Sequence, residues 1–82
     1  MIDAEAQAIY GIVTAMRPIL AGHSPGVQSA ALADCLAIWL AGHQIPGDED
    51  ATRTLRAELL AEYVSLVTEL VPLNARQLGT QE

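Results

Sequence analysis

The sequence contains no lysine, no phenylalanine and a single cysteine, Cys35, among its 82 residues. One cysteine excludes a disulfide within the chain, which is a common means of stabilising a small domain. The thiol lies in an apolar run, as expected for a buried cysteine in a reducing compartment. Because a hydrophobic core of this size is marginal by itself, association with another chain is the expected source of further stability.

Basic residues are also scarce, since four arginines stand against ten acidic residues and give a net charge of −6. Such a chain repels nucleic-acid phosphates and anionic membrane surfaces. The longest apolar stretch, residues 30–42, is interrupted by Asp34 and is shorter than the roughly 18 residues of a membrane span. The first residues are acidic, unlike the basic start of a secretory signal. We therefore expect a cytoplasmic protein with no nucleic-acid or membrane partner.

Patterns of catalytic or metal-binding residues are missing as well. The two histidines, His23 and His43, follow different predicted helices, which places them about 25 Å apart in an up-down arrangement. The acidic stretch from Asp48 has Arg53 and Leu59 where a calcium loop requires glycine and glutamate. No glycine-rich phosphate loop or Ser-His-Asp set is present. The sequence predicts no enzyme activity, no cofactor and no metal.

Apolar residues make up 51% of the chain, which is too many for a disordered protein. They recur at the i, i+3, i+4 spacing of amphipathic helices. The pattern predicts helices over about 3–20, 25–41 and 49–71, whose starts can be capped by Asp3, by Ser24 and by either Asp48 or Asp50. Pro18 is expected to kink or shorten the first, and Pro72 to end the third. This gives one helical domain, residues 1–72, and a polar C-terminal tail, residues 73–82.

The middle helix is apolar around most of its circumference, which is typical of a helix with neighbours on every side. Two other helices would leave one of its sides open. The sequence therefore predicts an all-α fold, a three-helix antiparallel bundle completed by homodimerisation. The open side carries an alanine stripe, which is either an exposed surface of good helix formers or a close-packed contact. We favour the contact because Asp34 alone gives that side little polarity.

A tetrapeptide, Leu-Ala-Gly-His, occurs twice, in "LAGHSPG" at residues 20–26 and "LAGHQIPG" at residues 40–47. It could mark an internal repeat, a histidine metal site or two helix ends. The flanking residues match poorly in this 20-residue register, whereas true repeats preserve a whole structural unit. Each glycine follows an apolar helical run, where a left-handed residue can close a helix. We interpret the two copies as helix ends, with Gly22 and Gly42 as left-handed caps.

One possible ion pair joins the second and third predicted helices. If they pair antiparallel, Asp34 falls level with about residue 57 and can reach Arg56. Alternatively, each side chain extends separately to water. The residues expected to form the interface are Ala30, Ala33, Asp34, Ala37, Trp39, Ala41 and Arg56.

Two functions are consistent with this composition. The first is a small, acidic, self-associating module for protein–protein interaction, which binds itself and could also bind another protein. The second is a helical bundle or enzyme accessory subunit that binds a small molecule in an apolar pocket lined by Trp39, Met16 and Tyr63. The sequence contains no signal for a particular ligand or pathway.

Overall fold

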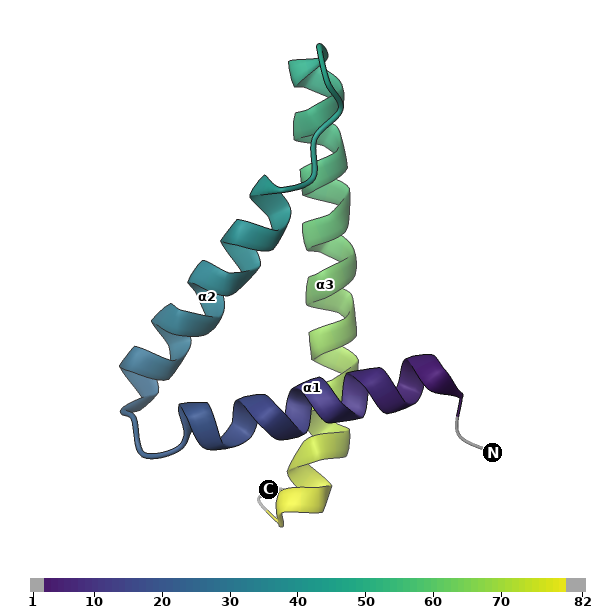
Figure 1. The fold of residues 1–82 in the computed structure, drawn as a ribbon. Coiled ribbons are helices and arrows are strands. Elements are labelled where there is room, and N and C mark those ends of the chain that lie inside the picture. The colour runs from purple at the N-terminus through teal and green to yellow at the C-terminus, as the bar shows by residue number, and fades with distance from the viewer. Residues whose placement is uncertain (1–2, 80–82) are drawn as a thin grey trace. The chain divides into compact units, whose positions relative to one another are not determined.

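The computed structural model describes residues 3–79, and three helices with no strand account for most of this part (Figure 1). They are α1 (Ala4–Leu20), α2 (Pro25–Ala41) and α3 (Glu49–Leu78). This confirms the all-α prediction. The chain divides into two compact units, Met1–Asp34 and Cys35–Glu82. Over residues 3–79, none of the helices combines the length and hydrophobicity that a membrane span requires.

Each helix begins at a polar side chain that accepts a backbone N–H of the first turn. The Asp3 carboxylate accepts the N–H groups of Glu5 and Ala6. Ser24 Oγ accepts one N–H at the start of α2 over 3.3 Å. Asp48, rather than Asp50, caps α3, and its carboxylate accepts the Ala51 N–H over 2.9 Å. The short polar residues therefore fix the helix starts as predicted from sequence.

A tight turn follows α1 in the first unit. Ala21 has φ −60° and ψ 142°, Gly22 has φ 87°, and the His23 N–H donates to the Leu20 carbonyl over 3.3 Å. These angles define a type II turn, in which the third residue needs a positive φ. Gln28 Nε2 also donates to the Leu20 carbonyl over 2.9 Å. The first turn of α2 therefore satisfies the last carbonyl of α1.

The second copy of the tetrapeptide ends its helix differently. The His43 N–H again donates to the carbonyl three residues back, that of Leu40, over 3.0 Å. However, Gly42 is not among the described glycines with a positive φ. The left-handed cap predicted at Gly42 is therefore wrong, whereas the positive φ predicted at Gly22 is confirmed. The sequence likeness fixes the hydrogen bond in both copies but not the glycine conformation.

This difference predicts opposite effects of alanine at the two glycines. Gly22→Ala should lower the free energy of unfolding by about 1–2 kcal/mol, because an L-residue is strained at positive φ. Gly42→Ala should be neutral or stabilising by up to about 1 kcal/mol, because alanine restricts the unfolded chain. A Cβ at Gly42 would meet only the Trp39 and Ile38 carbonyl oxygens, at ordinary distances of 3.5 and 3.6 Å. Urea unfolding of both variants measures the contrast, and equal effects would contradict it.

The third helix is longer than the sequence predicts. α3 continues through Pro72 to Leu78, so the expected end at residue 71 and the polar tail from residue 73 are wrong. Its terminal cap is Gly79, which has φ 73° and ψ 23° and donates its N–H to the Ala75 and Arg76 carbonyls. A left-handed glycine is a strong helix terminator, whereas a helix can bend to accommodate the lost hydrogen bond and the clash that a proline introduces. Residues 80–82 of the expected tail lie outside the described part.

Neither unit, by itself, buries any of its described residues. Even Cys35, which we expected to be buried, is exposed. Partial burial is concentrated in the second unit, on the last turns of α2 and the first turns of α3. The half-buried residues there are Leu36, Leu40, His43, Ala51, Thr52, Leu55, Arg56 and Leu59.

Candidate functional site

The corner between α2 and α3 is held by one arginine. Nε of Arg56 donates to the carbonyls of Leu40 (3.1 Å) and His43 (3.0 Å), and Nη2 donates to that of Ala41 (2.8 Å). The last carbonyls of a helix have no partner within the helix and carry a partial negative charge. α2 has no basic residue in its own last turn, so an arginine from α3 supplies the missing donors.

The loop that follows α2 is fixed by a second set of bonds. Ile45–Asp48 forms a turn in which the Asp48 N–H donates to the Ile45 carbonyl over 3.2 Å. Pro46 occupies its second position and Gly47, with φ 80°, its third, as in a type II turn. Thr52 Oγ1 accepts the Ile45 N–H over 2.9 Å and lies within hydrogen-bond distance of the Ile45 and Asp48 carbonyls. The loop is therefore ordered by α3.

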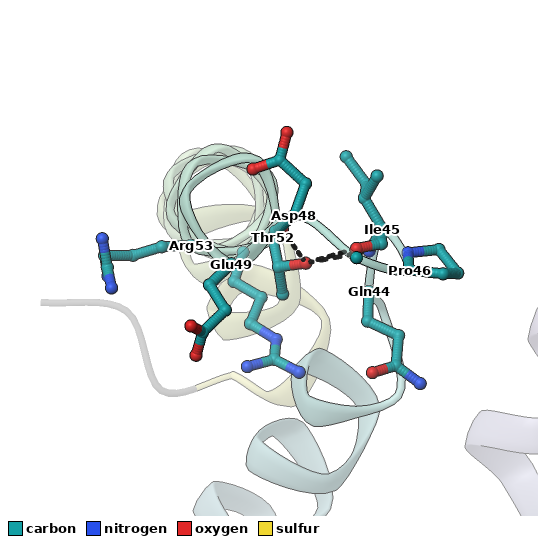
Figure 2. A pocket seen from close by; sticks show the side chains of 9 residues that line it. Gln44, Ile45, Pro46, Asp48, Glu49, Thr52 and Arg53 are labelled. Carbon is teal, nitrogen blue, oxygen red and sulfur yellow. Dashed lines mark hydrogen bonds between the residues drawn. The ribbon is translucent and has the colours of Figure 1, made fainter.

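An open pocket of about 410 Å³ lies between this loop and the start of α3 (Figure 2). Its cations are already engaged, because Arg56 binds carbonyls and Arg53 forms a 2.9 Å ion pair with Asp50. In Figure 2 the Arg53 side chain extends away from Ile45 and Pro46. The residues that line the pocket are Gln44, Ile45, Pro46, Gly47, Asp48, Glu49, Thr52, Arg53 and Arg56.

His43 takes part in closing α2 at this corner. The His43 Nδ1 lies 2.7 Å from the Trp39 carbonyl, and the two rings meet edge to face with centroids 4.7 Å apart. Since the carbonyl can only accept, Nδ1 is the donor. The histidine therefore helps close α2 and is not available as a base at that nitrogen. Within residues 3–79, no group of three or more His, Cys, Asp or Glu side chains is arranged to hold a metal.

The residues predicted to form the interface fall in both units. Ala30, Ala33 and Asp34 lie in the first unit and are exposed. The members in the second unit are Ala37, Trp39, Ala41 and Arg56, of which only Arg56 is half-buried. The predicted pair of Asp34 with Arg56 would join the units and stays a prediction. Within its own unit, Arg56 has the α2 carbonyls as partners, a role that sequence reasoning missed.

The residues of the predicted apolar ligand pocket are also divided between the units. Met16 lies in the first, whereas Trp39 and Tyr63 lie in the second. All three are at least 37% exposed. The pocket found in the second unit has a different lining, in which six of the nine residues are polar. Thr52, which orders the loop that lines this pocket, carried no sequence signal beyond its position near a helix start.

A second hollow lies far from this corner, on the C-terminal part of α3. It is a shallow groove of about 370 Å³ lined by Val67, Leu70, Val71, Asn74, Ala75 and Leu78. The four large apolar members are 39–63% exposed. The third helix predicted from sequence ends at residue 71 and therefore includes only Val67, Leu70 and Val71 of these residues. Comparison of the chain with protein-family models, with curated proteins and with solved structures finds no match.

Proposed function

We propose that the chain is a self-associating protein–protein interaction module, in which the three helices close into an antiparallel bundle and a second copy covers apolar surface that this bundle leaves exposed. The observation that carries this proposal is the burial pattern. Among residues 3–79, twenty large hydrophobic side chains are exposed, and neither unit buries any of these residues. Monomeric soluble proteins rarely leave a large contiguous apolar surface in water. These exposed apolar side chains therefore require contact with other helices of the chain or with a second chain.

The apolar surface of α3 is large enough for association. Nine large hydrophobic side chains between Leu60 and Leu78 are exposed. Full burial of such a side chain contributes about 1.5–3 kcal/mol, so covering the exposed half contributes about 1 kcal/mol. Nine from each of two copies could contribute on the order of 20 kcal/mol, against an association cost of roughly 4–15 kcal/mol. Burial of part of this surface would therefore be sufficient.

The two helix connections favour the bundle topology. The type II turn after Leu20 and the Ile45–Asp48 turn are both short and hydrogen-bonded. Short connections of this kind are typical of antiparallel neighbouring helices. α1 also exposes apolar residues at the spacing of one helix face, among them Ile9, Ile12, Val13 and Met16. Each of these faces can be covered by its neighbours in the bundle.

Sedimentation over a wide concentration range tests the proposal. We expect a species of twice the 8.7 kDa chain mass that dissociates on dilution, with loss of helical circular dichroism as it does so. A folded monomer at every concentration would overturn the proposal. Fluorescence of Trp39 separates the alternative function, because a small-molecule module would respond to an apolar ligand at constant chain concentration.

A further inference from the structure

We infer that two copies of this chain meet through the C-terminal part of α3, Val67–Leu78, with the helices antiparallel and Asn74 of each copy at the two-fold axis. The inference rests on the proposed self-association and specifies its surface. It differs from the α2 interface that the sequence predicts.

The lengths of the three helices indicate which part of α3 is left for a second copy. α3 has 30 residues, whereas α1 and α2 have 17 each, which corresponds to about 45 Å against about 25 Å. In an up-down-up bundle the shorter helices extend alongside α3 only to about residue 66. The last three turns of α3 would therefore project beyond such a bundle. In the structure, α3 has no half-buried residue between Leu59 and Ala75.

This C-terminal segment carries a stripe of four apolar side chains and one asparagine. Val67, Leu70, Val71, Asn74 and Leu78 follow one another at the i, i+3, i+4, i+7, i+11 spacing that lies on one face of a helix. Together they line most of the groove on α3. A second helix with the same stripe fits such a surface, because packed helices interdigitate at this spacing.

Charge favours a copy of the same chain as the occupant. The chain as a whole has a net charge of −6, so most pairs of surfaces on two copies repel each other. The segment 67–78 carries one acid and one base, Glu69 and Arg76, and so has no net charge. At 100° per residue both lie on the side of α3 opposite the stripe. Two copies can therefore meet here without bringing like charges together.

Asn74 fixes the register. It is the one polar side chain of the stripe, and a buried amide requires a hydrogen-bond partner. An amide both donates and accepts, so a second Asn74 across a two-fold axis satisfies it. The antiparallel direction keeps the acidic remainders of the two chains at opposite ends. In this register Leu70 of one copy faces Leu78 of the second copy.

A charge on the stripe tests the surface. Leu70→Lys should weaken self-association about 100-fold or more, because the substitution buries two unpaired charges in a two-fold interface. Ser65→Lys, which adds the same charge on the opposite side of α3, should change the self-association constant less than about threefold. Sedimentation gives the association constant of each variant, and circular dichroism checks that both variants are helical. If Leu70→Lys associates like the wild type, the surface is wrong and self-association stands. If the wild type is monomeric, both proposals fail.

The register has its own tests. Asn74→Asp should weaken association at least about tenfold at pH 7, because it places two carboxylates at the axis, and association should recover below about pH 4 as they gain protons. In a Cys35→Ser background, a mixture of Leu70→Cys and Leu78→Cys chains should give mainly the mixed disulfide on oxidation. Mainly like-with-like disulfides would show a parallel pair and overturn the antiparallel register. Association of Asn74→Asp that is unchanged and independent of pH would remove Asn74 from the axis.

Discussion

Arg56→Met is expected to lower the free energy of unfolding by about 1.5–3 kcal/mol, the range for hydrogen bonds to a charged group. The substitution removes the Arg56 donors to the Leu40, Ala41 and His43 carbonyls and keeps most of the apolar stem of the side chain. The Leu40 carbonyl still accepts the His43 N–H. The three bonds are not additive, because one guanidinium makes them all and water can reach part of the site. The effect should appear as a lower urea midpoint with an unchanged slope.

Arg53 provides a matched control on the same helix. It is also an arginine, but its side chain is 76% exposed and pairs only with Asp50. Arg53→Met should therefore change the stability by less than about 1 kcal/mol. Arg56→Lys should recover little, because an ammonium group cannot present the planar donors of a guanidinium to several carbonyls. Equal effects at Arg53 and Arg56 would show that the α2 carbonyls do not depend on Arg56.

The helix starts could be predicted from sequence because their signals are local. Asp3, Ser24 and Asp48 each act on backbone groups two or three residues away, so their roles follow from position alone. The bounds of α2 follow from the same signals together with the turns that flank it. Similar reasoning gave the all-helical class, which depends on hydrophobic periodicity and needs no tertiary contact.

The corner could not be predicted, because its bonds join residues far apart in the chain. Arg56 caps a helix that ends 15 residues earlier, and Thr52 holds a turn that begins seven residues earlier. Sequence reasoning paired Arg56 with Asp34, the opposite charge that the sequence shows, and that pair stays a prediction. Backbone carbonyls also accept hydrogen bonds from a guanidinium, but they have no signature in the sequence. A search for basic residues about two turns into the following helix would have suggested that Arg56 caps α2.

The length of α3 was missed because two local signals conflict. Pro72 predicts a helix end, whereas Gly79 predicts one seven residues later. Proline removes one N–H and clashes with the preceding turn, but a helix can bend to accommodate it. Glycine at the end supplies a left-handed residue that stops the helix and satisfies its carbonyls. The extra turns place Asn74 and Leu78 on the stripe, so this error concealed the candidate interface.

Pro72→Ala is the second substitution with a large expected effect, in the stabilising direction. Proline in a helix interior costs about 3 kcal/mol relative to alanine. In α3 it leaves the Thr68 carbonyl without an N–H at residue 72, while the Thr68 hydroxyl donates to the Val64 carbonyl over 2.8 Å. Alanine restores that N–H. Opening of residues 73–78 should then cost about 2–3 kcal/mol more, which slows their amide exchange by roughly 30- to 150-fold.

Pro18→Ala is the matched control, because Pro18 is also inside a helix but only two residues from its end. Few residues beyond it can fray, so amide exchange over the last turn of α1 should slow by less than about tenfold. Exchange by mass spectrometry resolves both segments in the same experiment. If residues 73–78 exchange equally fast in Pro72→Ala and the wild type, the last turns of α3 are held by contacts outside the helix. If their amide exchange slows as expected, the break in hydrogen bonding at Pro72 is what limits the order of the last turns of α3, on which Asn74 lies.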